Sequence, residues 1–82
     1  MSDWITVVDD TTSNLSTLSY TLTEEGFRVS ALRSGAELLD FLEKNTPDLI
    51  LLDVHMPGMD GFETMNGIRQ IESAKQIPVI FL

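Results

Sequence analysis

Short apolar runs along the chain alternate with longer segments in which apolar residues recur every three or four positions. The short runs cover residues 4–8, 27–32, 48–53 and 77–82 and are rich in Val, Ile, Leu and Phe. Runs of this length, flanked by acidic residues, Gly or Pro, predict β-strands. The third run is apolar at nearly every position, which indicates a strand buried on both faces of a parallel sheet.

The longer segments predict three amphipathic helices. Leu15, Leu18 and Leu22 form one apolar stripe, and Gly26 provides a natural stop. The helices are predicted over residues 12–25, from Ser34 to about Asn45, and from Asp60 to about Ile71. Candidate N-caps are Thr11 or Thr12, Ser34 with Glu37 three residues on, and Asp60 with Glu63 three residues on. Core-facing positions in the second and third helices are predicted at Ala36, Leu38, Leu39, Leu42, Phe62, Met65 and Ile68, with Ile71 as a further candidate.

The resulting order of elements is βαβαβαβ. This alternation predicts an α/β domain with a parallel sheet, helices on both faces and right-handed crossovers. Because no linker or low-complexity segment interrupts residues 1–82, we expect a single domain. The sequence stops inside its most hydrophobic strand, so we expect these residues to be the N-terminal portion of that domain.

The chain is acidic, with 13 Asp and Glu against 5 Lys and Arg and a formal net charge of −8. This excess of negative charge argues against direct binding to nucleic acid or to an anionic membrane surface. The chain has no cysteine, its N-terminus lacks a signal-peptide pattern, and no apolar stretch approaches the length of a membrane span. These features predict a cytoplasmic protein without disulfides.

Acidic residues follow two of the predicted strands: Asp9 and Asp10 come directly after the first, and Asp53 ends the third. If these strands are parallel neighbours, the three carboxylates meet at one edge of the sheet. Each close pair of like charges then costs about 4 kcal/mol at a surface-like dielectric. We therefore expect a cation to neutralise the cluster, and an oxygen-only pocket favours a hard cation such as Mg²⁺. The plainer interpretation is that these are ordinary acids at strand ends and helix N-termini.

Four segments form a specific combination at this spacing. They are Val-Val-Asp-Asp at 7–10, Pro-Asp-Leu-Ile-Leu-Leu-Asp at 47–53, Met-Pro-Gly-Met-Asp-Gly-Phe-Glu at 56–63 and Ile-Pro-Val-Ile-Phe-Leu at 77–82. Together they resemble the receiver domain of two-component response regulators, and the resemblance covers essentially the whole chain.

The resemblance implies a flavodoxin-like, doubly wound parallel sheet with strand order 2-1-3-4. It implies a phosphorelay module that accepts a phosphoryl group from the phosphohistidine of a sensor histidine kinase or phosphotransfer protein. Such a module is a signalling domain rather than an enzyme, because its own chemistry is limited to self-phosphorylation and autodephosphorylation. Asp53 would be the phosphoacceptor and a Mg²⁺ ligand, Asp10 a direct Mg²⁺ ligand and Asp9 a ligand through water. The backbone carbonyl of His55 would be a further ligand, while its side chain is expected to be solvated.

The chain also departs from the family pattern. The family has a Ser or Thr at the end of the fourth strand and a Lys at the end of the fifth, but here the fourth strand ends at Leu82. The fourth helix, fifth strand and fifth helix are also missing from the 82 residues. We therefore expect an acceptor site without the groups that drive the switch. Residues 77–82 would form an exposed edge strand, and we expect a homodimer or aggregation through it.

Two other functions stay open. A Mg²⁺-dependent phosphohydrolase with an aspartyl nucleophile commonly has a second Asp two residues after the first, but His55 occupies that position. A protein-binding or assembly module that is not phosphorylated is the second alternative.

Overall fold

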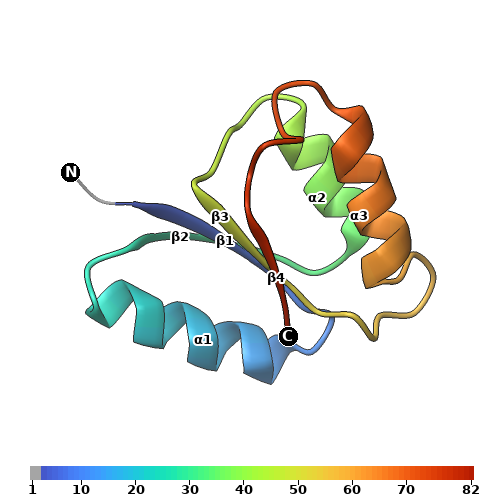
Figure 1. The fold of residues 1–82 in the computed structure, drawn as a ribbon. Helices are drawn as coiled ribbons and strands as arrows, with labels where there is room; N and C mark the ends of the chain where they lie inside the picture. The colour runs from blue at the N-terminus through green and yellow to red at the C-terminus, as the bar shows by residue number, and fades with distance from the viewer. Residues whose placement is uncertain (1–2) are drawn as a thin grey trace.

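The structure is a computed structural model that describes residues 3–82. Its four strands are all parallel and lie in the order β2-β1-β3-β4 (Figure 1). The elements are β1 (Trp4–Val8), α1 (Thr12–Glu24), β2 (Arg28–Leu32), α2 (Gly35–Leu42), β3 (Leu49–Leu52), α3 (Gly61–Gln70) and β4 (Val79–Phe81). The predicted βαβαβαβ order and the strand order 2-1-3-4 are therefore confirmed.

Helices cover both faces of the sheet, with α1 on one side and α2 and α3 on the other (Figure 1). On the α1 side, Ile5, Val7 and Leu15 form a small core. The larger core lies on the opposite side and contains Val8, Leu38, Leu42, Ile50, Leu52, Met56, Ile68, Ala74 and Ile77. Strand β3 sends alternate residues into both cores, which explains its unbroken apolar sequence.

Helices α2 and α3 each bury a face that begins with a glycine. The buried positions are Gly35, Leu38 and Leu42 in α2, and Gly61, Thr64 and Ile68 in α3. Because each residue is rotated by about 100° from the one before it in an α-helix, the residue after each glycine points away from the core. The predictions that Ala36 and Phe62 face the core are therefore wrong, since Ala36 is exposed and Phe62 is 62% exposed.

Helix α2 ends at Leu42, three residues before the predicted end at Asn45. After Leu42 the backbone tightens, and the Lys44 amide donates to the Phe41 carbonyl at 3.2 Å. The Asn45 side chain donates to the same carbonyl at 2.9 Å. Asn45 therefore closes the end of the helix from outside it.

The pairing of β1 with β3 positions the acidic residues. Val8 and Leu52 are partners in the ladder, and the next residues leave the sheet at the same edge. The Asp53 amide donates to the Val8 carbonyl at 2.9 Å, and the Asp9 amide donates to the Leu32 carbonyl at 3.1 Å. These bonds extend the sheet by one residue and fix the backbone beneath both carboxylates.

Candidate metal centre

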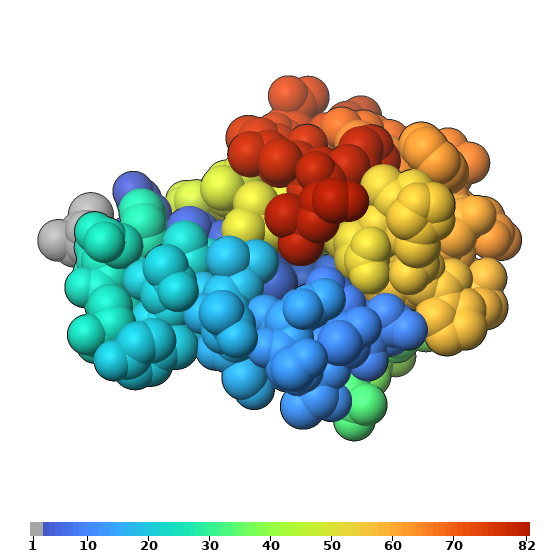
Figure 2. All heavy atoms as spheres, turned by 90° about the horizontal axis from the view of Figure 1, so that it is seen from below, coloured from blue at the N-terminus to red at the C-terminus, as the bar shows by residue number. Residues whose placement is uncertain are grey.

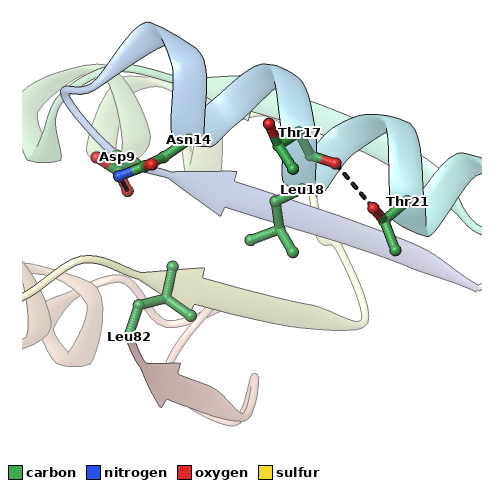
Figure 3. A pocket seen from close by; sticks show the side chains of 6 residues that line it. All are labelled: Asp9, Asn14, Thr17, Leu18, Thr21 and Leu82. Atoms are coloured by element: carbon green, nitrogen blue, oxygen red, sulfur yellow. Dashed lines mark hydrogen bonds between the residues drawn. The ribbon is translucent and has the colours of Figure 1, made fainter.

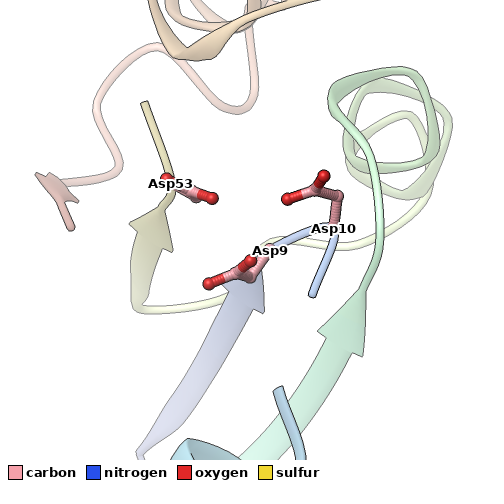
Figure 4. A group of neighbouring side chains, drawn as sticks. All are labelled: Asp9, Asp10 and Asp53. Atoms are coloured by element: carbon pink, nitrogen blue, oxygen red, sulfur yellow. The ribbon is translucent and has the colours of Figure 1, made fainter. Parts of the chain in front are cut away.

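Three carboxylates converge where β1 and β3 end. One oxygen from each of Asp9, Asp10 and Asp53 lies within 4.8 Å of the others, and Figure 4 shows Asp10 and Asp53 pointing toward each other. Asp9 is buried and the other two are half-buried. The structure thus brings together the three acids that the sequence placed at strand ends.

Asp9 is bound to the first turn of α1. One carboxylate oxygen accepts the Thr11 amide at 2.9 Å, and the other accepts the Asn14 side-chain amide at 3.3 Å. Thr11 occupies the predicted N-cap position, but its side chain makes no capping hydrogen bond. Both Asp9 oxygens are therefore bonded to residues at the start of α1, whereas the Thr11 side chain caps no amide of the helix.

Asn14 is a site residue that the sequence analysis missed. Its signal is its place in the first turn of the helix that directly follows the Asp9–Asp10 pair. A polar amide at that position reaches back to a carboxylate before the helix, and periodicity alone does not show this.

Asp53 is oriented by its own loop. One carboxylate oxygen accepts the His55 amide at 3.0 Å, and within residues 3–82 the other oxygen accepts no hydrogen bond. His55 lies on the exposed loop, as the sequence predicted for its side chain. One oxygen of the Asp53 carboxylate is therefore held by the His55 amide, while the other oxygen stays available to bind a ligand.

The acidic cluster has no basic partner in the described part of the chain. There the single ion pair joins Glu72 to Lys75 at 3.1 Å, on the exposed segment after α3. Like charges this close repel by about 4 kcal/mol per pair at a surface-like dielectric. An oxygen-only donor set with excess negative charge fits a hard divalent cation such as Mg²⁺.

A hollow of about 360 Å³ lies beside the acidic cluster, between α1 and the end of β4. Figure 2 shows the last residues, in red, next to α1 on this face. Figure 3 shows the residues that line the hollow, which are Asp9, Asn14, Thr17, Leu18, Thr21 and Leu82. Asp9 is the one charged residue among them, so the hollow is mainly apolar and hydroxyl-lined and adjoins the three-carboxylate site through Asp9.

A family model described as "Response regulator receiver domain" matches residues 5–82. The chain belongs to the response regulator receiver domain family. Receiver domains are signalling domains of two-component systems, and this assignment favours the predicted signalling role over a phosphohydrolase.

The curated relatives include a response regulator and a transcriptional regulatory protein. The response regulator PleD of Caulobacter vibrioides is 40% identical over 82 residues, which are 100% of this chain and 18% of PleD. The transcriptional regulatory protein AfsQ1 of Streptomyces coelicolor is 40% identical over 76 residues, 93% of this chain and 32% of AfsQ1. The chain thus spans less than a third of the length of either relative.

Solved receiver structures have the same fold. The chemotaxis protein CheY4 of Vibrio cholerae superposes with a TM-score of 0.94 at 32% identity, covering 99% of this chain and 68% of CheY4. The receiver domain of sensor histidine kinase PA1611 from Pseudomonas aeruginosa superposes with a TM-score of 0.93 at 27% identity. The match covers 99% of this chain and 66% of the PA1611 receiver chain. The latter is described with a magnesium ion coordinated in its active-site cleft. The flavodoxin-like assignment is confirmed by this likeness.

Within the described residues, every helix is too short or too polar to cross a membrane.

Proposed function

We propose that this receiver domain accepts a phosphoryl group on the Asp53 carboxylate, with Mg²⁺ held by Asp9, Asp10, Asp53 and the backbone carbonyl of His55. The observation that carries the proposal is the convergence of three carboxylates to within 4.8 Å at the ends of β1 and β3. The magnesium ion described in the cleft of the PA1611 receiver supports the choice of metal. Because one Asp9 oxygen accepts the Thr11 amide and the other accepts the Asn14 side-chain amide, a contact to the metal through water suits Asp9 better than direct ligation.

The phosphoryl donor is the phosphohistidine of a sensor histidine kinase or phosphotransfer protein. An Asp53 oxygen forms the new O–P bond, the P–N bond breaks, and its electron pair returns to the imidazole nitrogen of the donor. A bound Mg²⁺ supplies neutralisation of the phosphoryl oxygens. The His55 amide holds one Asp53 oxygen at 3.0 Å and thereby leaves the second oxygen to attack.

We propose that the 82-residue chain holds the acceptor part of this chemistry and switches poorly on its own. Its two lysines are Lys44 after α2 and Lys75 after α3, and Lys75 pairs with Glu72. Neither residue ends a sheet strand beside Asp53. The isolated chain should therefore be labelled slowly, because neither lysine meets the incoming phosphoryl group.

The proposal is tested by Asp53→Asn in a longer protein that contains these 82 residues within a complete receiver. Incubation with acetyl phosphate and Mg²⁺, followed by intact mass measurement, should add one phosphoryl group to the parent and none to the variant. Asp48→Asn is the matched control, because Asp48 precedes the opposite end of β3 and its side chain accepts the Trp4 amide, which Asn also does. Labelling of Asp53→Asn at the parent rate would remove Asp53 from its assigned role.

We also propose that a second copy of the 82-residue chain pairs with residues 77–82. Strand β4 contacts only β3 in the described sheet, and Ile80, Phe81 and Leu82 are 52%, 40% and 50% exposed. The negative charge of the chain and its exposed apolar edge both favour a protein partner over nucleic acid or membrane for this segment.

A further inference from the structure

We propose that Gly61 is a positioning residue for the acidic site. The absence of a side chain at Gly61 lets the first turn of α3 close against the backbone of Asp53 and Val54. That closure sets the position of the Asp53 carboxylate and of the His55 peptide. The inference rests on the proposed role of Asp53 and adds a residue that touches neither the metal nor the phosphoryl group.

The contact is steric and involves backbone on both sides. A Cβ at position 61 would lie 2.8 Å from the Val54 Cα and 3.0 Å from the Asp53 carbonyl oxygen. Positive φ values in the described residues occur at Gly26 and Gly58, so Gly61 has an ordinary helical backbone. Space, rather than backbone conformation, is therefore what requires glycine at position 61.

The sheet side of this contact cannot withdraw. The Asp53 amide is bonded to the Val8 carbonyl at 2.9 Å, inside the extension of the β1–β3 ladder. On the other edge of β3, the Leu82 amide donates to the Leu52 carbonyl at 2.9 Å. Moving Asp53 away from α3 would break these bonds, so the backbone at the end of β3 is fixed in position.

The helix side is fixed as well. The buried Thr64 hydroxyl donates to the Asp60 carbonyl at 2.7 Å and ties the first turn of α3 together. A side chain at Gly35 would collide with that hydroxyl, so α2 presses directly against the turn. Since α2 packs behind it, the start of α3 cannot move back to make room for a methyl group.

The part of the backbone that can move is the loop between the end of β3 and the start of α3, which includes Val54 and His55. The Gly61 amide donates to the Val54 carbonyl at 3.0 Å, and the next amide, that of His55, donates to Asp53 at 3.0 Å. A methyl group at position 61 would displace Val54 and, through it, the His55 peptide. The orientation of the Asp53 carboxylate would then change without loss of any ligand residue.

The test compares Gly61→Ala with Gly67→Ala in the 82-residue chain. Gly67 lies in the same helix, about 9 Å farther along its axis, and a Cβ there would meet the Leu39 side-chain carbons at 2.7 and 2.9 Å. Those side-chain ends can shift, so Gly67→Ala makes the same chemical change without touching the site. Mg²⁺ titration followed by amide NMR gives the affinity at residues 9–11 and 53–56, and thermal unfolding without metal gives the stability.

Gly61→Ala should lower Mg²⁺ affinity by about tenfold or more, as loss of an outer positioning group typically does, while Gly67→Ala keeps the wild-type affinity. Wild-type affinity in a folded Gly61→Ala variant would overturn the inference. If the wild-type chain itself shows no shifts at these amides, the proposed metal site fails instead, and the two failures are thereby distinguished.

A second measurement uses the wild-type chain alone and decides the case if Gly61→Ala does not fold. Because coupling between the site and the Gly61 contact is reciprocal, Mg²⁺ should slow hydrogen exchange of the Gly61 amide more than that of Gly67. Equal slowing of both amides, or none at Gly61 when metal binds, would contradict the role of Gly61.

Discussion

Asp10 differs from the other two acids of the cluster in what holds it. Among the described residues, Asp9 and Asp53 accept hydrogen bonds, whereas Asp10 accepts none. The negative charge of Asp10 is therefore repelled by Asp9 and Asp53, and no hydrogen bond offsets this repulsion. The favourable effect of an acid near a helix N-terminus, about 0.3–1 kcal/mol, is smaller than the repulsion of about 4 kcal/mol per close pair.

Asp10→Asn should therefore stabilise the metal-free chain, by about 1 kcal/mol after solvent screening of half-buried groups, and should weaken Mg²⁺ binding. Urea unfolding with and without Mg²⁺ measures both effects. The metal should raise the free energy of unfolding of the wild type more than that of the variant.

Asp40→Asn is the control for Asp10→Asn, because it removes the same charge from an exposed position in α2. It should change neither the metal-free stability nor the gain from Mg²⁺. A metal-free Asp10→Asn chain that is less stable than the wild type would show that Asp10 contributes contacts rather than repulsion.

The acidic cluster is predictable from the sequence because strand ends and parallel pairing are properties of the apolar pattern. Asp9, Asp10 and Asp53 converge once β1 and β3 are neighbours. The hydrogen bonds of Asp9 to Thr11 and Asn14 could not be predicted, since they depend on the angle at which α1 leaves the sheet. The apolar pattern of the sequence determines which residues lie at the same edge of the sheet. The geometry of the loops determines which carboxylate oxygens stay available to bind a metal.

At the level of elements, the two predicted helix starts at Thr11 and Asp60 are built differently. Asp60 accepts the Glu63 amide at 2.9 Å, and Glu63 accepts the Asp60 amide at 3.3 Å, which completes a capping box. At Thr11, the side chain makes no such bond. The energetic value of the two caps should differ accordingly.

Asp60→Ala should lower the free energy of unfolding by about 1 kcal/mol, the usual value of a lost N-cap. Thr11→Ala should change it by only a few tenths of a kcal/mol, as a surface substitution does. Urea unfolding followed by Trp4 fluorescence measures both, because the Trp4 ring packs on Phe41 with centroids 5.6 Å apart at the opposite end of β1 from the metal site. Equal losses for the two variants would mean that the capping box contributes nothing.

Helix rotation was the least predictable property of the elements. Both Phe62 and Ala36 looked core-facing because a large or apolar residue was expected to be buried. The buried positions are instead Gly61 and Gly35, where close approach of backbone or of Thr64 leaves no room for a side chain. Close packing at a glycine cannot be recognised from the spacing of apolar residues. Phe62 packs instead on the exposed Phe81, with ring centroids 5.5 Å apart.

For the whole molecule, the free edge of β4 has a geometry that suits a second copy. The Ile50 amide donates to the Pro78 carbonyl and the Leu82 amide donates to the Leu52 carbonyl, so Val79 and Phe81 direct their backbone groups away from β3. Two copies related by a two-fold axis would align these edges antiparallel, giving a closed pair. The alternating exposed side chains would then contribute on both faces of the joined sheet.

The 82-residue chain should therefore sediment as a dimer or larger species at micromolar concentration. Burying one exposed Ile, Leu or Phe side chain fully is worth about 1.5–3 kcal/mol, and Ile80, Phe81 and Leu82 are each about half exposed. Because each chain carries a net charge of −8, repulsion opposes association, and added salt should strengthen the association.

Ile80→Lys should give monomers, since a charge on an edge strand blocks pairing. Tyr20→Lys on α1, at a position 68% exposed, should leave association unchanged. A single 9.1 kDa species at every concentration and salt would exclude edge pairing.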